Sequence, residues 1–137
     1  MRKARESRIK FEGLGGSTVA RISGSLGTIF LDTGRLDSAE IYLRHSVEVY
    51  HQLGTGGMLP TLALANLGIC LARRGRAAES DSLLGQVRDA LPGAEEAGPL
   101  KTETVARLVR LHEERGDRAE AGYYRSLLAR SRAVSPP

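Results

Sequence analysis

Apolar residues recur along this chain at intervals of three and four, the spacing that places side chains on one face of an α-helix. One such stripe, within residues 37–53, consists of Ile41, Leu43, Val47 and Tyr50. Strand-like alternation of apolar and polar residues occurs only at residues 8–12. The pattern therefore predicts an all-α protein.

The helical pattern occurs three times. LGTIFLDTGRLDSAEIYL begins at Leu26, LGICLARRGRAAESDSLL at Leu67 and LVRLHEERGDRAEAGYYR at Leu108. Each copy has a glycine at the same point, and these glycines, 41 residues apart, are Gly34, Gly75 and Gly116. A fixed period is the signature of a repeat array, and glycine adopts the left-handed conformation that ends a helix. Three helical hairpins are therefore predicted, with turns at about 34–36, 75–76 and 116–117.

Polar residues at the expected helix starts predict how the helices are capped. Ser17 is expected to cap a helix at about 18–33, since its hydroxyl can accept a hydrogen bond from a backbone N–H. Asp37 with Glu40, and Asp117 with Glu120, have the three-residue spacing of a capping box. Together with the repeat, these signals divide the chain into a partial repeat at 1–16, repeats at 17–57, 58–98 and 99–132, and a tail at 133–137.

Each copy also carries small residues where its two helices should touch. They are Gly27, Gly68 and the larger Val109 in the first helices, and Ala39, Ser80 and Ala121 in the second helices. Small side chains let two helices approach to the short end of the ~8–10 Å range of interaxial distances. The hairpins are expected to stack on one another and share a core, because one hairpin cannot bury both of its faces.

The composition fits this architecture and favours one cellular compartment. With 137 residues, 41% of them hydrophobic and only 4% aromatic, the chain can build one domain with an aliphatic core. The single cysteine, Cys70, excludes an internal disulfide, favours a reducing compartment and is expected to be a packed, inert thiol. The N-terminus lacks the apolar segment of a secretory signal, and no apolar run approaches the ~20 residues of a membrane span. A cytoplasmic protein without a membrane partner is therefore expected.

The chain shows no arrangement typical of catalysis or of metal and cofactor binding. GLGGST at 13–18 lacks the lysine of a phosphate-binding loop and is interpreted as a linker. His45 and His51 fall on different faces of one helix, and His112 with Glu113 lacks the second histidine of a zinc protease motif. We therefore predict a protein that is not an enzyme and needs no cofactor or metal.

The spacing of residues within each copy resembles the tetratricopeptide repeat. That pattern has Leu-Gly, a large residue three positions on, a glycine four after that, and a small residue five after the glycine. The first copy matches it with Leu26-Gly27, Phe30, Gly34 and Ala39, and the second with Leu67-Gly68, Leu71, Gly75 and Ser80. The third copy keeps Leu108, Gly116 and Ala121 but has Val109 and His112. The period exceeds the usual ~34 residues and is similar to that of the kinesin light chain type and of repeat segments in bacterial regulators.

The resemblance implies a right-handed α-solenoid whose first helices line a concave groove that binds a protein or peptide. In this sequence the groove residues would be Arg21, Ser25, Thr28, Asn66, Ile69, Arg73, Arg107 and Arg110. Two of them, Asn66 and Arg107, match positions of the five-residue dicarboxylate clamp of chaperone-binding repeats, whose other positions hold Gly24, Thr28 and Glu103. Because guanidinium groups bind carboxylates in a bidentate manner, an acidic partner is expected for this groove.

Other interpretations remain open. A basic stretch at the N-terminus is compatible with a helical domain that contacts nucleic-acid phosphates, although the net charge is only +4. Its residues are Arg2, Lys3, Arg5, Arg8 and Lys10. The array is also compatible with the regulatory part of a larger bacterial signalling protein. Because residues 1–16 resemble half a repeat, the N-terminal end is expected to expose apolar surface through which the chain could form homo-oligomers.

Overall fold

The computed structural model describes residues 15–93 and 98–134, which fold into six α-helices and one short 3-10 helix, with no strand among them. The helices are α2 (Gly16–Asp32), α3 (Leu36–Leu53), α4 (Met58–Arg73), α5 (Ala77–Ala90), η1 (Leu91–Gly93), α6 (Pro99–Arg115) and α7 (Arg118–Val134). The predicted all-α class is confirmed over these residues. The partial repeat predicted at 1–16 lies almost entirely outside the described residues, as does most of the predicted tail.

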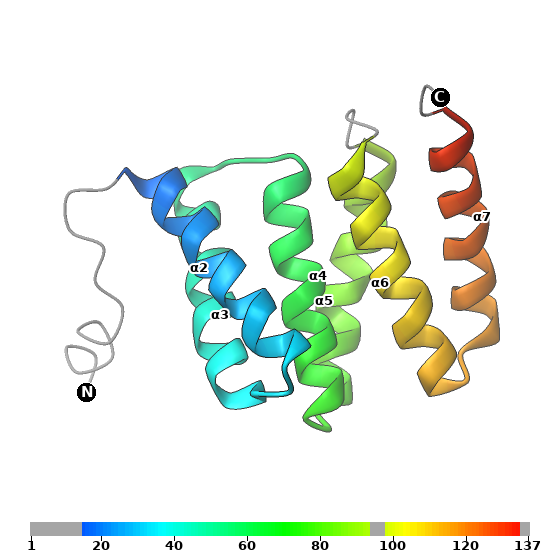
Figure 1. The fold of residues 1–137 in the computed structure, drawn as a ribbon, viewed down its shortest axis with the longest axis horizontal. Helices are drawn as coiled ribbons and strands as arrows, with labels where there is room; N and C mark the ends of the chain where they lie inside the picture. Colours follow the sequence, from blue (N-terminus) through cyan, green and yellow to red (C-terminus); the bar gives the residue numbers. More distant parts are fainter. Residues whose placement is uncertain (1–14, 94–97, 135–137) are drawn as a thin grey trace.

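The helices form three antiparallel hairpins that lie side by side along the long axis of the molecule (Figure 1). Each hairpin turns at a glycine that the repeat period predicts, and Gly34, Gly75 and Gly116 have φ angles of +79°, +82° and +75°. A side chain is strained at such angles, whereas glycine is not. The predicted positions of the turns are confirmed. As a result, α2, α4 and α6 share one face and run in the same direction (Figure 1).

The two helices of a hairpin approach each other closely at the glycines predicted to allow contact. A Cβ atom added at Gly27 would lie 2.5 Å from Cγ of Leu43, and one at Gly68 would lie 2.7 Å from Cδ2 of Leu84. Across the second contact, the Ser80 hydroxyl donates a hydrogen bond of 2.7 Å to the carbonyl oxygen of Gly68. Since no side chain fits at these distances, the tight packing of the first two hairpins depends on glycine.

The core is aliphatic and continues through all three hairpins. Leucine, valine and isoleucine supply most of it, and Tyr124 is its largest fully buried side chain. Cys70 is buried in this core, where its thiol donates a hydrogen bond of 3.5 Å to the carbonyl oxygen of Leu36. Burial raises the pKa of the Cys70 thiol, which keeps the thiol protonated. The expectation of a packed thiol is confirmed.

The polar residues predicted to cap the helices make other contacts. The N-cap residues are Gly15 for α2 and Arg35 for α3, and neither makes a side-chain hydrogen bond to the helix. The predictions of Ser17 as an N-cap and of Asp37 with Glu40 as a capping box are therefore wrong.

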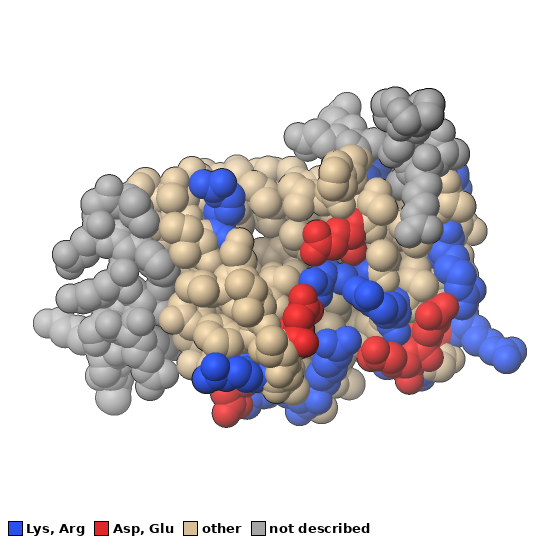
Figure 2. All heavy atoms as spheres, viewed as in Figure 1, with Lys and Arg blue, Asp and Glu red and all other residues tan. Residues whose placement is uncertain are grey.

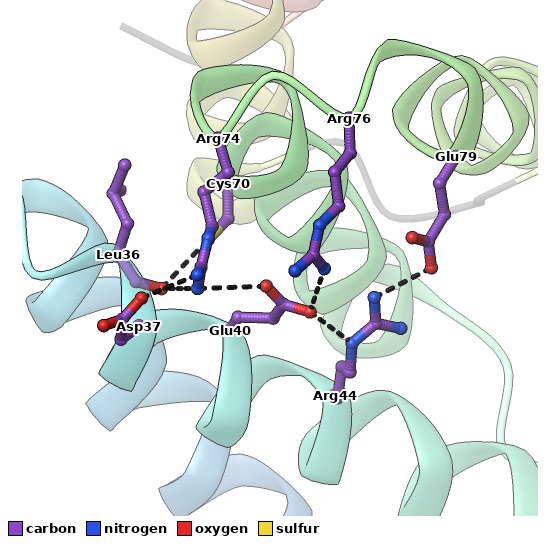
Figure 3. Close-up of polar contacts among 8 residues, drawn as sticks. All are labelled: Leu36, Asp37, Glu40, Arg44, Cys70, Arg74, Arg76 and Glu79. Atoms are coloured by element: carbon purple, nitrogen blue, oxygen red, sulfur yellow. Dashed lines mark hydrogen bonds and ion pairs between the residues drawn. The ribbon is translucent and has the colours of Figure 1, made fainter.

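Figure 3 shows the side chains that these two carboxylates contact. Asp37 lies 2.6 Å from Arg74 of the next hairpin, and Glu40 lies 3.1 Å from the same guanidinium. Glu40 also accepts hydrogen bonds of 2.7 Å from Arg44 and from Arg76. Burial alone would raise the pKa of Glu40, but the hydrogen bonds from these two arginines lower it overall. Because charged hydrogen bonds are the stronger ones, the carboxylates join the first hairpin to the second instead of capping α3.

The third hairpin uses its acidic residues in a similar way. Glu120 of α7 pairs with Arg88 of α5, whose guanidinium also lies over the ring of Tyr123, 4.1 Å from its centroid. Asp117 lies 3.2 Å from Nδ1 of His112 at the end of α6. Glu120 therefore joins α7 to the second hairpin, and Asp117 contacts the end of α6.

Candidate protein-binding face

The helices α2, α4 and α6 together present one broad face of the molecule, here termed the A face (Figure 1). Figure 2 shows two regions on it: mostly uncharged atoms around a recess near the starts of the helices, and charged side chains gathered further along. The exposed and half-buried polar residues of the A face include Arg21, Ser25, Thr28, Asp32, Arg73, Lys101, Glu103, Arg107, Arg110 and Glu114.

A cleft of about 520 Å³ lies where the three helices of the A face begin. Tyr50, Leu59 and Leu100 supply much of its apolar lining, and 39% of Leu59 and 36% of Leu100 are exposed. The described residues that line the cleft include two cations, Arg21 and Lys101, and no acidic residue. The volume lies within the range of about 300–1,000 Å³ common for ligand pockets. The cleft can therefore accept an apolar side chain and, beside it, a negative charge.

The second region of the A face, the arginine cluster, consists of Arg73, Arg107 and Arg110 with the acidic residues Asp32, Glu103 and Glu114. Arg107 donates two hydrogen bonds to the carboxylate of Asp32, at 2.9 and 2.8 Å, and a third to Glu103 at 3.3 Å. Arg73 lies 3.6 Å from Glu114. Arg110 is exposed and forms no ion pair with another described residue. The acidic residues of the arginine cluster are therefore direct partners of two of its arginines.

The Asp32 carboxylate is held in its charged form by these neighbours. The hydrogen bond from Arg107 has the largest effect and lowers the pKa of Asp32. Burial opposes it, and the positive charges of Arg107, Arg110 and Arg73 lower the pKa further. Arg107 and Asp32 are 75 residues apart and belong to the third and first hairpins. Their pairing therefore spans the face of α4 and links the two ends of the array.

Two of the predicted groove residues are not accessible. Asn66 and Ile69, both in α4, are 0% and 2% exposed. The Asn66 amide donates a hydrogen bond of 3.0 Å to the Thr28 hydroxyl, which in turn donates to the carbonyl oxygen of Gly24. The reason is position: α4 is the middle helix of the face and is covered by α2 on one side and α6 on the other. A partner on the A face would not touch these two side chains.

The other predicted groove residues do lie on the A face. Arg21, Ser25, Arg73 and Arg110 are exposed, Thr28 is half-buried, and Arg107 keeps 11% of its side chain exposed. Arg21 belongs to the cleft, and the other three arginines belong to the arginine cluster. The cleft itself was not predicted, because its lining comes from four helices and two loops that the sequence does not bring together. The only sequence feature that could have indicated the cleft is the pairing of leucine with proline at two helix starts, Leu59–Pro60 and Pro99–Leu100.

One contact has the form of a catalytic pair but is buried. Ser23 and His45 share a hydrogen bond of 2.8 Å between the hydroxyl oxygen and Nδ1. Ser23 is 0% exposed, so a substrate cannot reach it. Burial lowers the pKa of His45, which favours the neutral imidazole. The pair fixes α2 against α3.

The remaining candidate chemistry is limited. No three His, Cys, Asp or Glu side chains in the described residues are placed together to hold a metal ion. None of the described helices is both long and apolar enough to span a membrane. The basic stretch considered for nucleic acid, and the apolar residues considered for self-association at 1–12, lie outside the described residues.

Comparisons with protein-family models, with characterised proteins and with solved structures gave no match. The function is therefore inferred from the A face itself.

Proposed function

We propose that this protein is a non-catalytic scaffold that binds a segment of a partner protein on its A face. The proposal includes a right-handed array of tetratricopeptide-like hairpins, in which the A face is the concave side. It is supported by the constant 41-residue period, by a left-handed glycine at each turn, and by close helix contacts at Gly27 and Gly68. Such arrays present extended surfaces that bind other chains.

The cleft is the observation that carries the proposal. Its lining combines apolar residues with Arg21 and Lys101, and no described acidic residue lines it. The arginine cluster follows further along the same face. A suitable partner segment therefore has an apolar side chain for the cleft and acidic residues for Arg73, Arg107 and Arg110. We place this interaction in the cytoplasm, in line with the single buried cysteine, either on its own or as the regulatory part of a larger signalling protein.

Selection from a phage-displayed library of random 12-residue peptides tests the proposal. Peptides that bind the immobilised protein should be enriched in segments with a large apolar residue and several Asp or Glu. Their binding should be lost in the variant Arg21→Glu with Lys101→Glu, because charge repulsion replaces attraction at the cleft.

A matched control changes the same number of charges on another face. Arg118 and Arg130 of α7 are both exposed, so Arg118→Glu with Arg130→Glu should bind the selected peptides as the wild type does. Selection of basic peptides, or equal loss of binding in the two variants, would show that the A face is not the binding site.

A further inference from the structure

We propose that Asp32 is an internal competitor for the partner site: its carboxylate occupies Arg107 in the free protein and is displaced by an acidic side chain of the partner. The inference rests on the proposed function of the A face and names how that site is regulated. It follows from the geometry of one ion pair and from the charges around it.

Arg107 is held in place, whereas Asp32 can leave. Only 11% of the Arg107 side chain is exposed, against 50% of the Asp32 side chain. Glu103, one turn earlier in α6, binds Nε of Arg107 at 3.3 Å, while both Nη atoms reach the Asp32 oxygens at 2.8 and 2.9 Å. The guanidinium of Arg107 is therefore already oriented to bind a carboxylate through both Nη atoms. The carboxylate bound there, that of Asp32, is accessible to water.

The position of the Asp32 carboxylate is also where the positive charge of the A face converges. Arg107, Arg110 and Arg73 all favour its ionised form. A carboxylate supplied by a partner would meet the same three guanidinium groups if it took this position. Asp32 therefore marks a place on the A face where an acidic group is stabilised by three arginines, and at the same time it occupies that place.

Displacement would also separate parts of the molecule. Asp32 is the last residue of α2, and Arg107 lies in the middle of α6. Their pair links the first hairpin to the third across α4. When a partner takes Arg107, this link is released, while the contacts of α2 with α3 and α4 remain. Binding at the A face is thereby coupled to the way the two ends of the array are held together.

The test compares Asp32→Asn with Asp81→Asn, which removes an equal charge from an exposed pair with Arg115 on α5 and α6. The probe is the acetylated and amidated peptide Leu-Glu-Glu-Leu-Glu-Glu, titrated into ¹⁵N-labelled protein. Asp32→Asn should tighten binding about threefold to tenfold, since removing the competitor frees a bidentate ion pair. Asp81→Asn should change the affinity by less than about 1.5-fold, because salt screens distant charges.

A double variant separates competition from a general loss of charge. If Asp32 acts through Arg107, adding Arg107→Gln to Asp32→Asn should remove the whole gain in affinity. If the wild type and Asp32→Asn bind the peptide equally well and the peptide shifts amide signals of the A face, Asp32 is not a competitor, and the proposed function still stands. A peptide that perturbs no A-face amide in any variant would overturn both.

Discussion

Two helical glycines differ in what surrounds them, and the repeat predicts a helix contact for Gly27 but not for Gly85. A Cβ atom at Gly27 would meet Cγ of Leu43 at 2.5 Å and its backbone nitrogen at 3.1 Å. A Cβ atom at Gly85 in α5 would meet nothing within 4 Å. Gly27 is therefore required by the contact between α2 and α3, whereas Gly85 only weakens its helix.

Opposite effects on stability are expected from alanine at these two positions. Gly27→Ala should lower the free energy of unfolding by about 1–3 kcal/mol through overpacking, which exceeds the gain in helix propensity. Gly85→Ala should raise it by about 0.5–1 kcal/mol. Urea denaturation followed by circular dichroism measures both. If Gly27→Ala proved as stable as Gly85→Ala, the close approach of α2 and α3 would be wrong.

At the scale of elements, the hairpins are joined by charged side chains as well as by the core. Glu40 of α3 contacts three arginines, two of which, Arg74 and Arg76, belong to the second hairpin (Figure 3). Only 12% of the Glu40 side chain is exposed. The Glu79 side chain, by contrast, is 45% exposed, and among the described residues its ion pair is with Arg44. The two carboxylates lie in the same network but differ in burial.

Removing the charge of Glu40 should therefore destabilise the protein more than removing that of Glu79. We expect Glu40→Gln to lower the free energy of unfolding by about 1–3 kcal/mol, less than for a fully buried pair because the arginines stay hydrated. Glu79→Gln should cost less than about 1 kcal/mol. Thermal unfolding of both variants compares them under identical conditions, and equal melting temperatures would contradict a special role of Glu40.

The same network gives stability a defined dependence on pH. The arginines hold the pKa of Glu40 below its ordinary value of 4.5. On acidification the unfolded chain therefore takes up its proton first, so the stabilisation is complete above pH 4.5 and is lost as the pH falls through the lower folded value. Unfolding experiments between pH 6 and 3 should show a smaller loss in Glu40→Gln than in the wild type. An identical slope in both proteins would refute the lowered pKa.

Local signals explain which elements could be predicted. The turns were predictable because Gly34, Gly75 and Gly116 adopt positive φ angles that other residues avoid, and this preference needs no distant partner. The capping box predicted at Asp37 and Glu40 failed for the opposite reason. Asp37 and Glu40 have the right spacing for a local cap, but Arg74 and Arg76 arrive from another hairpin and bind them more strongly. Competition of this kind is not visible in a sequence window.

At the scale of the whole molecule, the candidate site was predictable only in part. The repeat correctly placed Arg21, Arg73, Arg107 and Arg110 on the face of the first helices. It could not show that the middle helix is covered on both sides, which buries Asn66 and Ile69. Nor could it show that Asp32 reaches Arg107 across 75 residues. Which side chains of a face stay accessible depends on how the hairpins are offset, and the period does not contain that information.

Substitutions are expected to have different effects at the two edges of the array. The glycine turns lie at one edge, whereas residues 54–57 lie at the other, where the helices of the A face begin (Figure 1). The cleft is lined by residues 55–57, by Gly98 and by the helix starts at this edge. Thr55, Leu59 and Leu100 are exposed there and pack into no core. Substitutions at this edge can change what the cleft recognises while the hairpins keep their fold, so new partners can be acquired without new architecture.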